Sequence, residues 1–277
     1  MESRTIVITG ASDGIGAAAA RILKADGAEV VLVGRSPDKT GRLAQELDVP
    51  FHLADYTDLD QVRRLAADLD ATYSRIDVLA NNAGAIMGER TVTTDGFEKT
   101  FQVNHLAGFL LTHLLMPKLV ASNAAVIQTA SRAAKVFSAF DINDLQNEKN
   151  YAPQSAYGNA KLANILFTRE LHRRFVDQGI SAAAFHPGVV ASNFASDTTH
   201  FMRFAYHTPV LKNLFTISSD KGAAPLVWLA TGAPGSDWKR GEYYEKKKPV
   251  QSVPQAHDDA LAYRLWEASE SMLHIAG

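Results

Sequence analysis

The 277-residue chain contains no cysteine, which excludes disulfides, thiol catalysis and zinc sites built on thiolates. No apolar run approaches the ~18 residues of a membrane-spanning helix, and the opening MESRTIVITG lacks a signal-peptide core. The formal net charge of −2 lacks the basic excess with which nucleic-acid-binding proteins neutralise phosphates. We therefore expect a cytoplasmic protein with no integral membrane segment and no nucleic-acid partner.

Metal-ligand patterns are scarce as well. No HExxH motif occurs among the nine histidines. His105, His113, His172 and His186 are scattered over the predicted elements, which is typical of core or surface histidines and not of a ligand cluster. We expect no metal site.

What the chain does contain is an alternation of short apolar runs with amphipathic stretches. Hydrophobic residues make up 46% of the sequence, enough for a sizeable core. The pattern predicts six strands, within residues 4–10, 28–35, 50–55, 75–84, 124–131 and 180–188. It predicts helices within residues 16–27, 37–47, 59–73, 96–119 and 155–178. Such alternation indicates one doubly wound α/β domain over residues 1–277, a parallel sheet with helices on both faces.

Two segments depart from this alternation. Residues 137–154 form a polar insertion, and residues 190–218 carry aromatic and aliphatic side chains without a clean period. Both follow the carboxyl ends of predicted strands, where ligands bind in open α/β sheets. We interpret residues 190–218 as a substrate loop; a subunit interface and a membrane-contacting patch are the alternatives.

A glycine-rich turn lies between the first strand and the first helix. In TGASDGIG (Thr9 to Gly16) the glycines are Gly10, Gly14 and Gly16. Glycines permit a tight turn and close backbone approach, and a helix start offers N–H groups and a positive dipole end to a pyrophosphate. The turn predicts a dinucleotide site, although any tight connection can also need glycines.

The end of the second strand indicates which dinucleotide binds. An acidic residue about 20 residues past the glycines is typical of NAD enzymes, but this chain has Gly34, Arg35 and Ser36. Arg35 can pair with the 2′-phosphate of NADP as a charge-assisted donor; the alternative is a solvated arginine near Asp38. The sequence favours NADP, with NAD less favoured.

A tyrosine and a lysine lie one turn apart in the last long helix. Tyr157 and Lys161 are spaced i and i+4, so they share a helix face. Taken alone, the pair is most simply two amphipathic residues whose polar ends reach water.

Together the motifs resemble a known family. TGASDGIG, NNAG (Asn81 to Gly84), Ser131, YGNAK (Tyr157 to Lys161) and HPG (His186 to Gly188) occur in the order of the short-chain dehydrogenase/reductase family. The resemblance covers residues 4 to about 245 and implies a Rossmann-type fold. The surrounding text, VNHLAGFLLT and AYGNAKLANILF, is most similar to the retinol-dehydrogenase-like branch, which acts largely on apolar carbonyls and alcohols.

The resemblance implies roles for individual residues. Tyr157 would be the general acid/base, with Lys161 its partner and a ribose ligand. Ser131 would bind the substrate oxygen, and Asn104 would hold a water linking Lys161 to solvent. The implied cofactor-binding residues are Gly10, Ser12, Asp13, Gly14, Ile15, Gly16, Arg35, Ser36, Asp55, Tyr56, Asn82, Ala83, Gly84, Tyr157, Lys161, Pro187, Gly188, Val190 and Ser192.

Structural alternatives exist for single members of this set: Asn104 as a helix breaker, Ser131 as a strand cap, and Asp55 as the start of a turn. Two positions depart from the family pattern. Asp13 stands where NADP-preferring members often carry a basic residue, which weighs against NADP. Ala160 stands where the family often has serine.

The lysine would tune the tyrosine. A free tyrosine has a pKa near ~10, and Lys161 with a cationic nicotinamide would favour the phenolate electrostatically. We predict an NADP-dependent oxidoreductase that interconverts a carbonyl and an alcohol on an apolar, small-to-medium substrate. The alternative is a catalytically idle dinucleotide-binding sensor or scaffold. The family resemblance also implies a homodimer or homotetramer.

Overall fold

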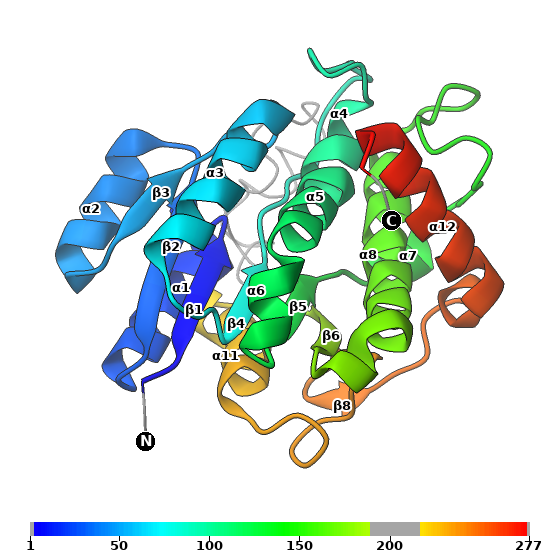
Figure 1. Cartoon of the computed structure of the whole chain (residues 1–277). Coiled ribbons are helices and arrows are strands. Elements are labelled where there is room, and N and C mark those ends of the chain that lie inside the picture. Colours follow the sequence, from blue (N-terminus) through cyan, green and yellow to red (C-terminus); the bar gives the residue numbers. More distant parts are fainter. Residues whose placement is uncertain (1–2, 189–216, 276–277) are drawn as a thin grey trace.

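A computed structural model describes residues 3–188 and 217–275, and in it one sheet of eight strands runs through the molecule (Figure 1). The strand order is β3-β2-β1-β4-β5-β6-β7-β8, and all neighbouring pairs are parallel except β7 and β8. The strands are β1 Thr5–Thr9, β2 Glu29–Gly34, β3 Phe51–Leu53, β4 Val78–Asn81, β5 Ala125–Thr129, β6 Ser181–His186, β7 Glu242–Glu245 and β8 Lys248–Pro249. The predicted parallel, doubly wound sheet is confirmed.

The sequence did not predict the antiparallel edge made by β7 and β8. Lys246 and Lys247 have φ values of 49° and 62°, both in the left-handed region. Two such residues form the tight turn that reverses the chain into a hairpin, pairing Glu245 with Lys248. The strands are too short, and β8 too polar, to give a periodic signal.

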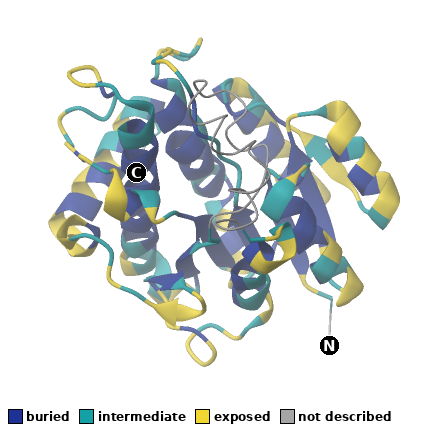
Figure 2. Ribbon diagram, turned by 180° about the vertical axis from the view of Figure 1, so that it is seen from behind, coloured by how far each residue is buried: buried dark blue, intermediate teal, exposed yellow. Residues whose placement is uncertain are grey.

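The central strands are buried on both faces, because helices cover the sheet on each side (Figure 2). Every residue of β1 is buried. Ile6 and Ile8 enter one core and Val7 enters the other. A strand buried on both faces needs a nearly continuous apolar run, and the sequence TIVIT of β1 has this pattern.

The helices form two layers. One layer contains α1 (Gly14–Ala25), α2 (Pro37–Leu47) and α11 (Ser219–Thr231), which share a core with one face of the sheet. The other contains α3 (Leu59–Thr72), α5 (Ala107–Leu114), α8 (Pro153–Phe175) and α12 (Asp259–Leu273) (Figure 1). The α1 helix presents four buried alanines, and these small side chains allow it to pack closely on α11 and the sheet.

The strand order fixes where a ligand can bind. From β1 the chain winds outward through β2 and β3, then returns to place β4 on the other side of β1. In open α/β sheets, ligands bind at the carboxyl ends of the strands where the order reverses. The carboxyl ends of β1 and β4 are therefore the expected site, and both the glycine turn and the NNAG motif begin there.

The helix predicted over residues 96–119 is confirmed only in part. Residues 99–114 are helical, but as α4 (Lys99–Phe101), a π-helical turn η1 (Gln102–Leu106) and α5; α6 (Met116–Ala121) follows as a separate helix. Pro117, which lacks an N–H, lies in the first turn of α6. The π-turn contains Asn104, and such turns are frequent at functional sites. The other long helix, predicted over 155–178, ends as α8 at Phe175, with a 3₁₀ turn over Val176–Gln178.

The C-terminal helix α12 packs along α8 on the outside of the second layer (Figure 1). Trp266 of α12 contacts Phe109 and Phe167, with ring centroids 4.9 and 5.6 Å away. A short helix α7 (Ala133–Val136) precedes α8, and the polar insertion between them has neither helix nor strand up to residue 152. Across the described ranges, none of the helices has the length and apolarity needed to cross a bilayer.

Candidate active site

The glycine-rich turn leads from the carboxyl end of β1 into α1. Gly10 has a φ of 64°, and a Cβ there would lie 2.7 Å from Ala83 Cα. A Cβ on Gly16 would lie 2.4 Å from the Gly10 carbonyl oxygen. Asp13 caps α1, its carboxylate accepting from the Gly14 N–H at 2.7 Å. The turn must therefore be bare backbone, and it places a helix N-terminus where a phosphate is favoured. It also carries the partly buried Ser12 and Ile15.

Two side chains hold the turn against the loop after β4. The Thr9 hydroxyl accepts from the N–H groups of Asn82 and Ala83, both at 3.0 Å. The Asn82 amide donates to the Thr9 carbonyl at 3.0 Å and accepts from the Thr129 hydroxyl at 3.1 Å. One asparagine thus joins the carboxyl ends of β1, β4 and β5, which fixes the wall of the expected cofactor site.

The end of β2 contributes exposed charge. Arg35 is exposed, and within the described ranges its guanidinium has no hydrogen bond or ion pair. Ser36 caps α2 by accepting from the Lys39 N–H at 3.3 Å. The Lys39 ammonium lies 3.1 Å from an Asp13 oxygen, and both side chains are about half exposed. The acidic charge that weighed against NADP is therefore paired with a base.

The predicted adenine-side residues Asp55 and Tyr56 follow β3. The Asp55 carboxylate turns back to accept from the N–H and the hydroxyl of Thr57, both at 2.9 Å. The Tyr56 ring is buried in the core with Val33 and Leu79, and burial raises the pKa of its hydroxyl. The phenol therefore does not face solvent, and only the backbone of Tyr56 is placed to border a ligand.

Tyr157 and Lys161 are buried on α8. The Lys161 ammonium lies 5.5 Å from the centroid of the Tyr157 ring and donates to the Thr129 carbonyl at 3.0 Å. Only 1% of Lys161 is exposed, and burial lowers the pKa of its ammonium to about 7. The simpler interpretation of the pair, two polar ends reaching water, is excluded by this burial. The ammonium is held beside a phenol in a site of low dielectric.

Ser131 reaches this region through a close contact between α7 and α8. Its hydroxyl accepts from the Ala133 N–H at 3.2 Å. A Cβ on Gly158 would lie 2.8 Å from both the Ala133 carbonyl oxygen and the Ser138 nitrogen. The glycine directly after Tyr157 therefore lets the segment that begins with Ser131 pack on α8.

Asn104 lies in the π-helical turn, across a glycine from Lys161. Its side-chain oxygen accepts from the Ala85 N–H at 3.1 Å, and its amide donates to the carbonyls of Ala85 and Thr100, both at 2.9 Å. A Cβ on Gly84 would lie 2.5 Å from the Asn104 oxygen and 3.0 Å from the Lys161 nitrogen. The NNAG loop is thus held directly between two of the predicted catalytic residues.

The HPG motif follows β6. The His186 Nδ1 accepts from the Arg132 N–H at 3.4 Å, and burial together with the Arg132 charge lowers the pKa of His186 to about 4. Pro187 and Gly188 are partly buried, and Gly188 has a φ of 92°. Val190, Ser192 and the predicted loop over residues 190–218, apart from its last two residues, lie outside the described residues.

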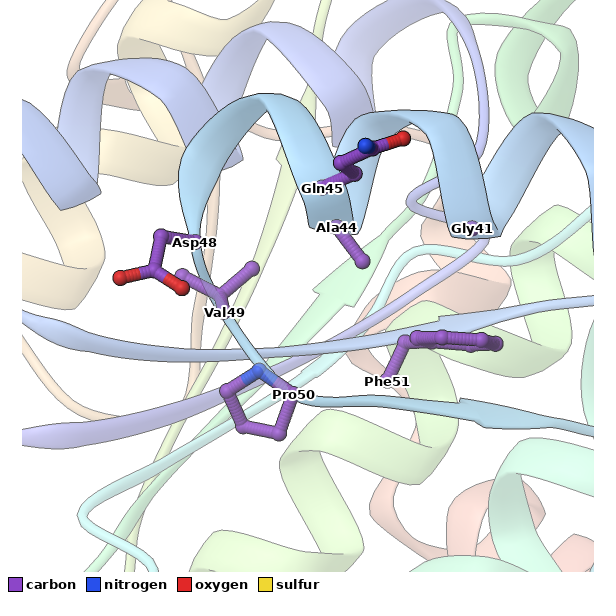
Figure 3. Close-up of a pocket in the computed structure, with 7 residues that line it drawn as sticks. All are labelled: Gly41, Ala44, Gln45, Asp48, Val49, Pro50 and Phe51. Atoms are coloured by element: carbon purple, nitrogen blue, oxygen red, sulfur yellow. The ribbon is translucent and has the colours of Figure 1, made fainter.

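A separate pocket opens at the other end of the sheet (Figure 3). It lies between α2 and the start of β3, where Phe51 is 42% exposed. Because the strands are parallel, the amino end of β3 faces away from the carboxyl edge that carries the glycine turn. None of the predicted site residues that the structure describes lines it; the lining is Gly41, Ala44, Gln45, Asp48, Val49, Pro50 and Phe51. In the described ranges, no group of three histidine or acidic side chains is arranged to hold a metal.

Four residues of the site were missed by sequence reasoning. Thr9 and Thr129 are each the last residue of a strand, a position that could have suggested contact between neighbouring strand ends. Gly158 is a glycine inside a long helix, which usually has a packing reason. Lys39 lies four residues after Arg35, in the first turn of the helix that follows the second strand.

Comparisons with known proteins agree with this geometry. A family model described as short chain dehydrogenase matches residues 4–202. The "Putative daunorubicin C-13 ketoreductase DnrU" of Streptomyces sp. (strain C5) is 41% identical over 97% of this chain and 92% of its own length. Retinol dehydrogenase 14 of Mus musculus is 34% identical over 99% and 87%. The Pseudomonas aeruginosa RhlG/NADP active-site complex is similar in structure, with a TM-score of 0.68 and 26% identity over 87% of this chain and 93% of that one.

Proposed function

The chain belongs to the short-chain dehydrogenase/reductase family, in its retinol-dehydrogenase-like branch, and from this premise we propose that it is an NADP-dependent oxidoreductase for apolar carbonyls and alcohols. Enzymes of the family use a nicotinamide dinucleotide to interconvert CH–OH and C=O groups. The observation that carries the proposal is the buried Tyr157 and Lys161 pair, with Asn104 just across Gly84.

The residues at the carboxyl edge fit a dinucleotide. Gly10 and Gly16 each sit where a Cβ would meet backbone atoms at 2.7 Å or less, so the turn is bare backbone beside the start of α1. Such a surface suits a pyrophosphate, whose oxygens accept from backbone N–H groups at a helix start. Arg35 and Lys39 supply positive charge at the end of β2, on the adenosine side.

The chemistry assigned to this chain is a proton transfer. A bound nicotinamide supplies hydride to the carbonyl carbon, or accepts it in the reverse direction. In reduction, the Tyr157 hydroxyl donates its proton to the substrate oxygen, which the Ser131 hydroxyl holds by a hydrogen bond. Lys161 stabilises the phenolate that remains, because an opposite charge nearby favours the ionised form. The Thr129 carbonyl keeps the ammonium in place, so little reorganisation is needed during the transfer.

Preference for NADP rests on the charges at the end of β2. Arg35 is exposed and can offer its planar fork of donors to a 2′-phosphate. The Lys39 pair with Asp13 reduces the repulsion that an unpaired acid would exert on that phosphate. The NADP complex of the structurally similar Pseudomonas protein supports the same choice.

An apolar substrate is supported by side chains next to Ser131. Val136 and Phe137, at the end of α7, are 62% and 48% exposed. Their helix packs on the part of α8 that carries Tyr157. The names of the relatives give daunorubicin and retinol as the compounds on which those proteins act. We propose an apolar carbonyl substrate of small-to-medium size.

The test is a turnover assay with NADPH and with NADH against a panel of apolar aldehydes, ketones and quinones. We expect activity with NADPH, higher than with NADH, and loss of that activity in Tyr157→Phe. An intact protein that binds NADPH but turns over no member of the panel would favour the idle sensor or scaffold instead. A homodimer or homotetramer stays a prediction, to be measured by sedimentation equilibrium.

A further inference from the structure

A buried histidine connects the catalytic region to the C-terminal helix. His105 belongs to the π-helical turn, directly after Asn104, and is 2% exposed. Its Nε2 lies 3.1 Å from the Ser269 hydroxyl of α12, and its Nδ1 lies 3.3 Å from the side-chain oxygen of Asn164 on α8. The rings of Phe101 and Phe167 lie against it, with centroids 5.0 and 6.1 Å away. The proposed reaction assigns this histidine no role.

The hydrogen-bond partners determine which nitrogen of His105 carries the proton. The Asn164 amide nitrogen donates to the Asn104 carbonyl at 3.0 Å, so the Asn164 oxygen faces His105. A carbonyl oxygen can only accept. The Nδ1 must therefore carry the hydrogen, and Nε2 must accept from the Ser269 hydroxyl. That hydroxyl also lies 2.8 Å from the Leu265 carbonyl, but within α12 this carbonyl already accepts from the Ser269 N–H, so the hydroxyl can give its one hydrogen to His105. The ring is neutral because burial, with the charge of Lys161 adding to it, lowers the pKa of His105 to about 4.

The reverse arrangement leaves polar atoms unpaired. If Nε2 carried the hydrogen, the Nδ1 lone pair would face the Asn164 oxygen. Turning the Asn164 amide over would relieve that contact, but its oxygen would then face the carbonyls of Asn104 and Thr129. Unpaired polar groups in a buried site are costly. All hydrogen bonds therefore run one way, from Ser269 through His105 and Asn164 to those carbonyls.

The chain of hydrogen bonds ends at the partner of the catalytic lysine. The Thr129 carbonyl accepts from Lys161 at 3.0 Å and lies 3.5 Å from the Asn164 amide nitrogen, at the outer limit of a hydrogen bond. The Asn104 carbonyl accepts the shorter bond from Asn164. Asn164 lies three residues after Lys161, so it faces the same side of α8. Its amide is placed to fix two carbonyls beside the ammonium.

We propose that Ser269, His105 and Asn164 are positioning residues, whose one-way hydrogen bonds hold the carbonyls of Asn104 and Thr129 in place around Lys161. In this assignment α12 helps to position the active site through Ser269, although none of its side chains contacts the reacting atoms. The catalytic part of the inference rests on the proposed function. The direction of the hydrogen bonds does not.

The first experiment reads the tautomer in the wild-type protein. Nitrogen-15 NMR of the histidine rings distinguishes a protonated Nδ1 from a protonated Nε2, with the His105 signals assigned by their loss in His105→Gln. We expect neutral His105 with the hydrogen on Nδ1. A hydrogen on Nε2 would reverse the hydrogen bonds and overturn the inference. No variant of Ser269 or Asn164 has to fold for this measurement.

The second experiment compares kcat among variants of the buried polar side chains Ser269 and Asn164. Ser269→Ala removes the donor to His105, and we expect kcat to fall about 2- to 10-fold, as the loss of one hydrogen bond predicts. Asn164→Leu removes the three contacts of that side chain, to His105, Asn104 and Thr129, and we expect a fall of about 10- to 100-fold. Ser269→Cys restores a weak donor of similar size and should recover part of the loss.

Thr168→Val is the matched control. Thr168 is also fully buried on a helix of the same layer, and its hydroxyl donates to a backbone carbonyl four residues earlier, that of Asn164, at 2.9 Å. Ser269→Ala and the valine control should lose similar thermal stability, while kcat should fall only in Ser269→Ala. Equal kcat values in the two variants would overturn the positioning role. Failure of the proposed function would show differently. The wild-type enzyme would then have no turnover, or a turnover that Tyr157→Phe leaves unchanged.

Discussion

Lys161 and Lys39 belong to the same candidate site but differ in how far they are exposed to solvent. Lys161 is 1% exposed and donates to a backbone carbonyl, and burial lowers the pKa of its ammonium to about 7. Lys39 has 46% of its side chain exposed and pairs with a carboxylate that is exposed to the same degree. The buried end of the site is fixed by backbone contacts, whereas the exposed end is held by one ion pair that water and a ligand can compete for. A rigid, buried lysine suits the proposed proton transfer, and an exposed lysine that can exchange partners suits the choice of cofactor.

The largest expected effect is at the buried end. Tyr157→Phe keeps the ring in its packed position but removes the proton that the proposed mechanism transfers. We expect kcat to fall by about 10²–10⁴-fold, the usual contribution of a general acid or base, with the dissociation constant for NADPH nearly unchanged. Stopped-flow turnover and fluorescence titration of NADPH measure the two quantities. A variant as fast as the wild type would contradict the mechanism.

The next effect concerns the cost of burying Lys161. Its pKa is about 7 in the fold and ~10.4 in an unfolded chain, so between these values the unfolded chain binds more protons. Unfolding free energy should therefore rise with pH across this window, and below pH ~7 the full cost of burial remains. Lys161→Met removes that cost, and we expect it to exceed the wild type in stability by about 1–4 kcal/mol at pH 6.

The comparison is made by urea unfolding of the cofactor-free proteins from pH 6 to pH 10. The stability difference should shrink as pH rises towards the unfolded-state pKa, because the cost of deprotonating the wild-type lysine on folding falls as the unfolded chain itself begins to lose that proton. Other titrating groups are common to the two proteins and cancel in the difference. Two parallel stability curves would show that Lys161 stays charged throughout, contrary to its burial.

Arg35 tests the exposed end. Arg35→Ala should lower kcat/KM with NADPH by roughly 10- to 150-fold, because a hydrogen bond to a charged group contributes about 1.5–3 kcal/mol. With NADH the value should hardly change, since NADH has no 2′-phosphate. Steady-state kinetics with both cofactors separate the cases. Equal losses would make Arg35 structural and remove the main support for NADP.

The smallest effect is expected from the ion pair itself. Asp13→Asn keeps an N-cap for α1 but removes the acid beside the adenosine side. Exposed pairs are worth about 0.2–1 kcal/mol, so we expect kcat/KM with NADPH to rise by about 1.4- to 5-fold and that with NADH to stay the same. Lys39→Ala, the matched change of the partner, should shift NADPH kinetics the opposite way. A rise in kcat/KM with both cofactors would mean that the substitution acts through folding or through the shape of the glycine-rich turn, and not through the 2′-phosphate.

Much of this fold could be predicted because its signals are local. Apolar runs such as TIVIT predict buried parallel strands, and glycines followed by an alanine-rich stretch predict a turn that leads into a closely packed helix. The π-helical turn at Asn104 could not be predicted in the same way. A π-turn is set by where the side chain is held, here by Ala85 across the loop after β4, and that contact exists only in the folded chain.

The site divides along the same line. Tyr157 and Lys161 share one helix, so their proximity follows from spacing. The Asp13 and Lys39 pair joins two different helices, 26 residues apart, and the Ser269 to His105 contact joins residues 164 apart. Such pairs depend on how helices pack on the sheet. A sequence read on its own shows Asp13 as an uncompensated acid, and the structure shows it paired.

The two edges of the sheet have a consequence for association. Unpaired backbone at a sheet edge invites another chain to add a strand, and short edges with lysine or proline discourage it. One edge here is the three-residue β3; the other is the two-residue β8, which contains Lys248 and Pro249 and follows Lys246 and Lys247. Neither offers a length of backbone for a partner to extend. Copies of this enzyme that assemble should therefore meet through helices or loops, leaving the carboxyl edge open to cofactor and substrate.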